Sequence, residues 1–236
     1  EPVLGSMGMI AATREFLQTL RDEATANDIV LIFDEVITLR INHGGAQNYF
    51  GVTPDLTCMG KIIGGGLPVG GIGGKEEFMQ LFNPESSNPV MHASTFSGNA
   101  LTMSAGLPAM RMYNEDECNR INLLAERLRD GFNQAFADAG ILGNAAGVGS
   151  LTNINFTEGI LNDSRDYLDG LFKAKHIGQL LHLSMLRHGV FSASRLMYCT
   201  STPMTASDID TAVAALQNSL AELRPYVESE CPELII

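Results

Sequence analysis

The run "IVLIFDEV", residues 29–36, indicates how the chain is organised. Consecutive apolar residues lead directly into two carboxylates, Asp34 and Glu35. An unbroken apolar run is typical of a strand buried on both faces of a parallel sheet. Ligands of open α/β sheets bind beyond the carboxyl ends of such strands. We therefore expect a fully buried parallel strand whose end carries a functional carboxylate.

A second short strand is predicted at 55–59, within "DLTCMGKIIGGG", residues 55–66. It leads into Lys61 and three glycines. This combination costs folding free energy, because burying an ammonium removes its hydration and ordering a glycine loses more conformational entropy than ordering any other residue. Since the ends of parallel strands meet at one edge of a sheet, we expect Lys61 and Asp34 to lie together and buried. Such a lysine could form an imine with a carbonyl compound. The spacing is equally compatible with a structural salt bridge between Lys61 and an acid.

Two phosphate-binding patterns are excluded by their spacing. Gly60 and Lys61 are followed by Ile62, and Asp55 stands where a Walker loop requires its first glycine. The segment "GGIGGK", residues 70–75, lacks the G-x-G-x-x-G spacing of a dinucleotide fingerprint.

Outward from these strands, the first half of the chain alternates helices and strands. The patterns predict a helix capped by Thr13, a glycine-rich strand at 68–74, a short helix at 76–82, and a helix at 98–113 kinked by Pro108. This alternation indicates an α/β architecture up to residue 113. We take residues 1–113 as the first domain.

The second half, residues 114–236, predicts a small α+β domain. It opens with a long amphipathic helix at 114–140 that ends at Gly140. A strand at 150–156, a polar surface loop at 157–170, a helix at 173–189, a strand at 195–199 and a final helix from Ser207 to about Leu223 are expected to follow.

Composition narrows the class of protein. A formal net charge of -12 with no basic run argues against a nucleic-acid partner. No apolar stretch is long enough to cross a membrane. The four widely spaced cysteines suit reduced thiols, and we expect a cytoplasmic protein. Three histidines recur every six residues and so share no helical face, which argues against a metal site: His176, His182 and His188.

Three ordered blocks resemble the class III, pyridoxal-phosphate-dependent aminotransferases of fold type I, a group that includes glutamate-1-semialdehyde aminomutase. They are "LIFDEVIT" (31–38), "GVTPDLTCMGKIIGGGLPVGGIGG" (51–74) and "HASTFSGNALTMSAG" (92–106). The resemblance runs from residue 1 to about 156 and returns at 188–210. It implies that 1–113 is the C-terminal part of the cofactor-binding large domain, with a mainly parallel sheet, and that 114–236 is the small C-terminal domain.

The resemblance also implies roles for single residues. Lys61 would form the internal aldimine with pyridoxal 5'-phosphate and then shuttle a proton. Asp34 would pair with the pyridine nitrogen, and Val36 would pack against the ring. Ser94 and Thr95 would bind cofactor, with Thr95 contacting the phosphate in the partner subunit's site, which implies a homodimer. The glycines at 64–66 would let the backbone pass close to the cofactor.

The implied activity is amino-group transfer between an amino acid and a keto acid. Arg40 and Arg195 are the candidate clamps for the substrate carboxylate, because a guanidinium offers a planar bidentate fork. One alternative is the 2,1-aminomutase reaction, which uses the same Lys61 and Asp34. The family pattern extends before residue 1, so we expect a truncated enzyme, and a second alternative is a non-catalytic fragment that folds and dimerises without cofactor.

Overall fold

The computed structural model describes all residues 1–236, which form two compact units. The first unit comprises Glu1–Pro2 and Ala12–Cys118, and the second comprises Val3–Ala11 and Asn119–Ile236. The interpretation of these parts as large and small domains, with a boundary at 113, stays a prediction. The mixed α/β class predicted from the sequence is confirmed.

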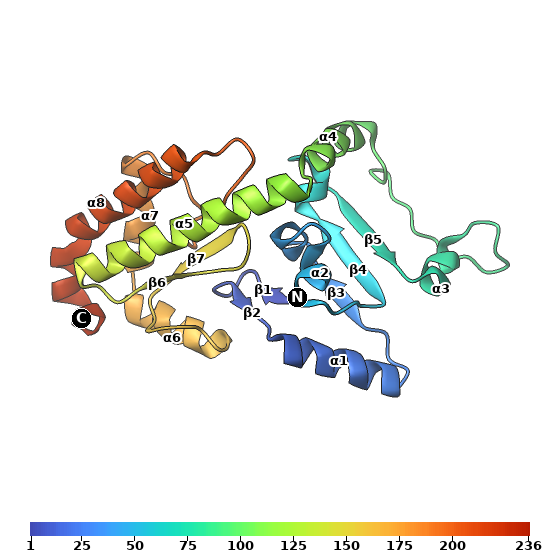
Figure 1. The fold of residues 1–236 in the computed structure, drawn as a ribbon, viewed down its shortest axis with the longest axis horizontal. Helices are drawn as coiled ribbons and strands as arrows, with labels where there is room; N and C mark the ends of the chain where they lie inside the picture. The colour runs from blue at the N-terminus through green and yellow to red at the C-terminus, as the bar shows by residue number, and fades with distance from the viewer. The chain divides into compact units, whose positions relative to one another are not determined.

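The first unit is built on a three-stranded sheet in the order β3 (Ile32–Asp34), β4 (Leu56–Gly60) and β5 (Gly70–Gly74), shown in Figure 1. The strands β3 and β4 are parallel, with Asp34 opposite Cys58. β5 returns antiparallel to β4, with Gly60 opposite Gly70. The chain turns back within ten residues after β4, which is too short for the crossover that a parallel neighbour requires.

Helices of the first unit begin where the sequence supplies caps. The Thr13 hydroxyl accepts a hydrogen bond from the Phe16 N–H at 3.1 Å, and the Asn99 side chain accepts one from the Thr102 N–H at 2.9 Å. Pro108 lies inside the helix that Asn99 caps. The elements are α1 (Arg14–Ala26), η1 (Thr38–Ile41), α2 (Gly45–Phe50), η2 (Lys61–Gly64), α3 (Glu76–Met79), η3 (Gln80–Phe82) and α4 (Ala100–Met112).

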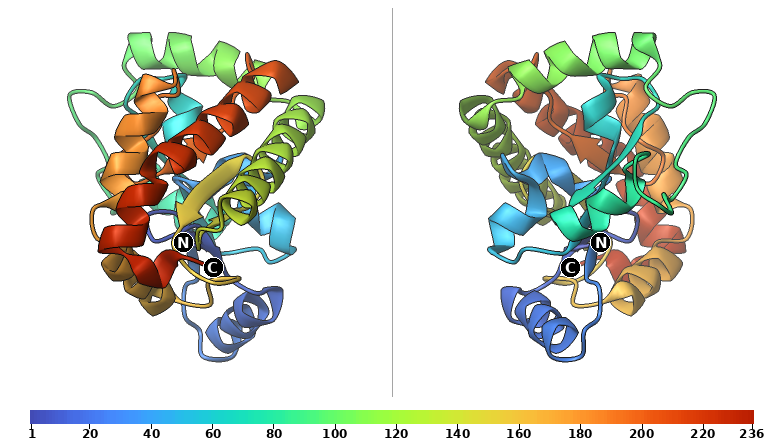
Figure 2. Two further views of the ribbon diagram at one scale, coloured as in Figure 1. Left: turned by 90° about the vertical axis from the view of Figure 1, so that its left-hand side faces the viewer. Right: turned by 90° about the vertical axis from the view of Figure 1, so that its right-hand side faces the viewer.

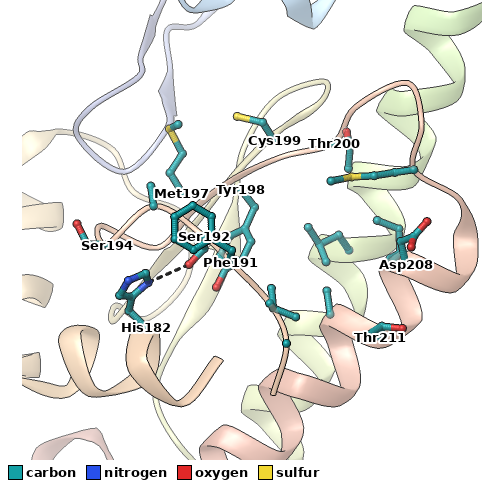
Figure 3. A pocket seen from close by; sticks show the side chains of 17 residues that line it. His182, Phe191, Ser192, Ser194, Met197, Tyr198, Cys199, Thr200, Asp208 and Thr211 are labelled. Carbon is teal, nitrogen blue, oxygen red and sulfur yellow. Dashed lines mark hydrogen bonds between the residues drawn. The ribbon is translucent and has the colours of Figure 1, made fainter. Parts of the chain in front are cut away.

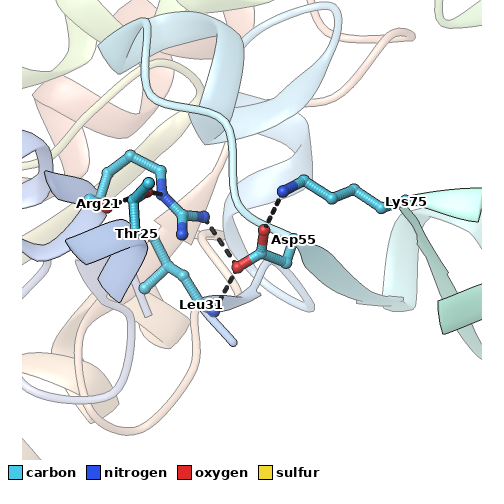
Figure 4. A network of polar contacts seen from close by, with 5 residues as sticks. All are labelled: Arg21, Thr25, Leu31, Asp55 and Lys75. Carbon is cyan, nitrogen blue, oxygen red and sulfur yellow. Dashed lines mark hydrogen bonds and ion pairs between the residues drawn. The ribbon is translucent and has the colours of Figure 1, made fainter. Parts of the chain in front are cut away.

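Asp55 joins three segments of this unit just before β4 (Figure 4). Its carboxylate accepts hydrogen bonds from Arg21 at 2.9 Å, from the Leu31 N–H at 2.6 Å and from Lys75 at 2.6 Å. Burial alone would raise the pKa of Asp55, but the hydrogen bonds from Lys75, Leu31 and Arg21 outweigh it and hold the pKa well below its usual value. One buried carboxylate therefore fixes α1, the approach to β3 and the end of β5.

The prediction that 29–36 is a strand buried on both faces is wrong. Only Ile32–Asp34 is extended in a ladder, and Ile29 and Ile32 are 60% and 52% exposed. The physical reason is that β3 is an edge strand paired with β4 alone, so no element of this unit covers that part of the run. Phe33, the next residue along the strand, faces the interior.

The second unit has a three-stranded antiparallel sheet and a short antiparallel strand pair. The long helix of this half is amphipathic as predicted, and Ile121, Leu128, Phe132 and Phe136 are all buried. Figure 2 shows α7 and α8 packed side by side. The elements are β1 (Val3–Leu4), β2 (Ile10–Ala11), α5 (Glu115–Ala139), β6 (Asn144–Ala146), β7 (Leu151–Asn155), α6 (Ser164–Ala174), α7 (Ile177–Arg187), β8 (Met197–Cys199), α8 (Ala206–Glu230) and η4 (Pro232–Leu234).

The polar loop predicted at 157–170 is also partly wrong, because α6 begins at Ser164. The Asp163 carboxylate accepts hydrogen bonds from the N–H groups of Arg165 and Asp166, at 2.7 Å and 3.2 Å. Such a side chain satisfies donors that the first helical turn cannot pair internally. The fully buried residues of this helix, Gly170 and Ala174, are both small.

Candidate active site

The carboxyl ends of β3 and β4 bring three of the predicted site residues to one edge of the sheet. Asp34 is the last residue of β3, and Lys61 follows β4 three residues after Cys58, the ladder partner of Asp34. Val36 lies against Gly60, where its Cγ1 would stand 3.3 Å from a Cβ at residue 60. The topology thus gathers an amine, a carboxylate and an apolar side chain around the end of two parallel strands.

Lys61 has an uncommon backbone conformation. It is the first residue of η2 and has φ of +46°, in the left-handed region that residues with a Cβ seldom adopt. Its side chain is exposed, as is that of Asp34, so the expectation that both are buried is wrong. Both groups lie on the open side of the strand ends, which leaves the amine accessible to a bound molecule. Backbone strain of this kind concentrates at functional sites.

The glycines after Lys61 serve packing within the chain. A Cβ at Gly64 would overlap the Val69 side chain, and one at Gly65 would overlap the carbonyl oxygen of Ala105 in α4. Among Gly64, Gly65 and Gly66, only Gly66 has no atom within 4 Å of its Cβ position. The expected role of 64–66 in admitting the cofactor is therefore retained as a prediction for Gly66, while Gly64 and Gly65 already have a packing reason.

Glu35 has a structural role that the sequence analysis does not assign. It is fully buried, and its carboxylate accepts hydrogen bonds from the Ala46 N–H, from the Gln47 N–H at 3.1 Å and from the Thr38 hydroxyl at 3.4 Å. Gly45 must lack a side chain because a Cβ there would overlap this carboxylate. Alternation along a strand is the signal that could identify it, since it places residues 34 and 35 on opposite faces.

Asp34 has no such network, and its hydrogen bond is local. Its Oδ1 accepts a hydrogen bond from the Val36 N–H at 3.0 Å, which orients the carboxylate at the strand end. The two neighbouring acids therefore differ in function: Glu35 holds the turn after β3 together from inside, and Asp34 presents an exposed charge at the sheet edge where Lys61 follows β4.

Arg40 lies in η1, and its backbone is fixed by a residue far away in sequence. The Tyr113 hydroxyl donates a hydrogen bond to the Arg40 carbonyl oxygen and contacts Cys118 Sγ at 3.1 Å. Burial, reinforced by the neighbouring Cys118, raises the pKa of the Tyr113 phenol. The hydroxyl therefore stays protonated and able to donate at neutral pH.

Ser94 and Thr95 lie in the exposed connection between η3 and α4. The Ser94 N–H donates to the Ser97 hydroxyl at 3.0 Å, and the Ser97 N–H donates to the Ser94 carbonyl at 3.1 Å. This compact turn leads directly to Asn99, the cap of α4. Ser94, Thr95 and Ser97 are exposed, and the Ser94 and Ser97 hydroxyls share a hydrogen bond of 3.0 Å.

Arg195 belongs to the second unit, where it lines a pocket of about 290 Å³ together with Tyr167, Lys175 and Gln179. The guanidinium is exposed and forms no ion pair; its Nη2 donates to the Met197 sulfur at 3.2 Å. Its charge is therefore free to bind an anion.

A larger pocket of about 780 Å³ in the second unit contains none of the predicted site residues (Figure 3). His182 Nδ1 and the Ser192 hydroxyl share a hydrogen bond of 3.3 Å at its wall. Burial raises the pKa of Tyr198 to about 12, and the adjacent Ser192 reduces the shift. The rest of the wall is mainly apolar, so the pocket offers hydrogen-bonding groups and no charged pair suited to catalysis.

The fold and the strand-end site define a mixed α/β protein that presents a left-handed, accessible lysine and an accessible carboxylate at the ends of two parallel strands. The family model for aminotransferase class-III matches residues 1–192, and the chain belongs to this family. No helix of the chain combines the length and apolar character needed to cross a membrane.

Two of the chain's relatives differ in the reaction that their names state. The chain is 36% identical over 92% of its length to the β-phenylalanine transaminase of Variovorax paradoxus, and covers 49% of that protein. It is 39% identical over 95% of its length to a glutamate-1-semialdehyde 2,1-aminomutase of Clostridium novyi (strain NT), and covers 52% of it. A solved structure described as a transaminase with PLP bound is 28% identical, with a TM-score of 0.85 over 97% of this chain and 52% of that one. The chain thus spans about half the length of the curated relatives it matches.

Proposed function

We propose that the protein containing this chain transfers an amino group between an amino acid and a keto acid, with pyridoxal 5'-phosphate as cofactor. The observation that carries the proposal is the left-handed, exposed Lys61 at the end of β4, with the exposed Asp34 at the end of the parallel neighbour β3. Membership of the aminotransferase class-III family and the PLP-bound neighbour support the choice of cofactor.

The residues at the strand ends fit this cofactor in their chemistry. Lys61 supplies an accessible primary amine, Asp34 an accessible carboxylate, and Val36 an apolar surface against Gly60. A cationic aromatic ring requires a carboxylate at its nitrogen and an apolar group against its face. The donor set therefore matches an aldehyde-bearing pyridine ring.

When bound, the cofactor supplies an aldehyde that condenses with amines and a ring that withdraws electrons from the reacting carbon. Lys61 would hold the cofactor through Nζ, and once the substrate amine has displaced it, the freed lysine amine would move the proton that leaves the substrate carbon. Asp34 would hold a proton on the ring nitrogen. Val36 would supply an apolar surface for one face of the ring.

Arg195 and Arg40 are proposed to bind substrate carboxylates. Arg195 is supported by its exposed guanidinium, which has no acidic partner, and by the pocket beside it. For Arg40 the support is its fixed backbone next to the Asp34 turn. Binding through a bidentate guanidinium would orient the amino acid for reaction.

The proposed protein is a homodimer in which Ser94 and Thr95 bind the cofactor phosphate, with Thr95 serving the partner subunit's site. The exposed hydroxyls of their turn support this assignment. In the same proposal, residues 1–113 belong to the cofactor-binding domain and residues 114–236 form the small domain.

The aminomutase reaction is the second candidate, and the aminomutase relatives favour it. Turnover of amino donors should be measured with and without an added keto acid, using the chain and its Lys61→Ala variant. Dependence on the keto acid supports the transferase, and turnover of an amino aldehyde without it supports the mutase. Lys173→Ala, an exposed lysine in α6, is the matched control. Turnover that survives in Lys61→Ala contradicts both proposals.

A further inference from the structure

The helix α4 touches the turn that carries Lys61 through backbone atoms. A Cβ at Gly106 in α4 would overlap the Ile63 carbonyl oxygen, and a Cβ at Gly65 would overlap the Ala105 carbonyl oxygen. Two glycines thus face the opposite backbone in a reciprocal contact. Figure 1 shows α4 lying across the end of β4, where η2 begins.

A second contact fixes the same helix to the end of the glycine tract. The Thr102 hydroxyl, on a fully buried residue, donates to the Pro68 carbonyl oxygen at 3.3 Å. The Thr102 methyl would stand 3.8 Å from a Cβ at Gly64. Residues 63–68 therefore rest against α4 at both ends.

The turn itself has few bonds of its own with which to hold Lys61. The Gly65 N–H donates to Ile62 at 3.3 Å, and the Leu67 N–H donates to Gly64 at 3.1 Å. A left-handed lysine is retained only where the surrounding structure determines it. The pairing of Gly60 with Gly70 holds the chain before Lys61, and the packing of α4 against Ile63 and Gly65 holds it after Lys61.

We propose that Gly106 is a positioning residue for Lys61: the missing side chain lets the α4 backbone hold η2 in place and so fixes the direction of the lysine amine. The proposal deepens the proposed function and rests on it. It assigns α4 two roles, since the turn before its cap carries Ser94 and Thr95 while its middle supports Lys61.

Helix propensity and this contact predict opposite results for Gly106→Ala. Alanine is the better helix former, so propensity alone predicts a more stable helix and an unchanged site. The overlap with the Ile63 carbonyl oxygen predicts that α4 and η2 separate, because neither partner is a flexible side chain. The matched control is Gly70→Ala in β5, where a Cβ meets nothing within 4 Å.

Two measurements on the full 236-residue chain distinguish an effect on the position of the Lys61 amine from an effect on the packing of α4 against η2 alone. Hydrogen exchange reports the mobility of residues 60–67, and borohydride reduction in the presence of pyridoxal phosphate reports the rate at which Lys61 is modified. We expect Gly106→Ala to stay folded and its amide hydrogens in residues 60–67 to exchange faster. We expect the rate of Lys61 modification to fall about tenfold or more, because a displacement near 1 Å misaligns the reacting atoms by enough to slow a reaction that much. Gly70→Ala should leave both within about twofold of the wild-type values.

Equal rates of Lys61 modification in folded Gly106→Ala and wild-type chains overturn the inference, even if exchange changes. If Gly106→Ala does not fold, Thr102→Val decides, because it keeps the shape of the side chain and removes only the bond to Pro68. Slower Lys61 modification in Thr102→Val supports the inference, and an unchanged rate overturns it. A wild-type chain that is not modified at Lys61 contradicts the proposed function itself, which is a different result.

Discussion

Asp55→Asn tests how much one buried carboxylate contributes to the first unit. The substitution keeps the shape of the side chain but removes the charge that faces Arg21 and Lys75. The Asp55 and Arg21 side chains are 5% and 17% exposed, so the variant leaves a largely buried guanidinium without its counter-ion. Breaking such a pair costs about 3–5 kcal/mol. Lys75 is 55% exposed, so losing its ion pair with Asp55 should cost about 1 kcal/mol or less of stability.

We expect Asp55→Asn to lower the free energy of unfolding by about 3 kcal/mol, the lower end of that range. Urea titration followed by far-UV circular dichroism measures it, and the midpoint should fall by about 1 M or more for a slope of about 2 kcal/mol/M. Asp210→Asn is the matched control, because the ion pair of Asp210 with Arg127 is 2.6 Å long, as is that of Asp55 with Lys75, but both of its side chains are exposed. Similar losses in the two variants would refute the reasoning.

Three further predictions concern acid sensitivity, the core and the two neighbouring acids. Because its pKa is lowered in the folded state, Asp55 stabilises the fold above about pH 4, and this contribution is lost as the pH falls further. The free energy of unfolding of Asp55→Asn, measured by urea titration, should therefore vary less between about pH 4 and pH 2 than that of the wild type. Phe132→Ala should cost about 3–5 kcal/mol by the same titration, while Leu123→Ala on the exposed side of α5 should cost little, and equal losses would contradict the assigned core. Glu35→Gln should lower the free energy of unfolding by about 2–3 kcal/mol, because buried backbone donors lose their charged acceptor. Asp34→Asn should leave the melting temperature unchanged and weaken retention of pyridoxal phosphate. A stability loss confined to Asp34→Asn would contradict these assigned roles.

Local patterns predict the parts of the site that depend on neighbouring residues in sequence. An apolar run that stops at a charged residue marks the end of a strand, and this pattern predicts Asp34 and Lys61 at one edge of the sheet, where β3 and β4 lie as parallel neighbours. Thr13 can be identified as a cap because its position before an amphipathic run is a local property. The Asp163 cap of α6 is an equally local signal, but the polar composition of 157–170 outweighs it and favours a loop.

The remaining features depend on residues far apart in sequence. The burial of 29–36 could not be predicted, since it depends on which strands lie beside β3. The left-handed backbone of Lys61 has its support in Gly106, about forty-five residues later, and no pattern relates the two positions. The same holds for the hydrogen bond from Tyr113 to the backbone of Arg40.

The measurement that tests the central claim most directly is the mass of the peptides after the chain is mixed with pyridoxal phosphate and reduced with borohydride. The account predicts visible absorbance before reduction and a pyridoxyl mass on Lys61, both of which are lost in Lys61→Ala. A colourless mixture, or a pyridoxyl mass scattered over exposed lysines such as Lys173 and Lys175, would contradict it and would favour a chain that folds without cofactor.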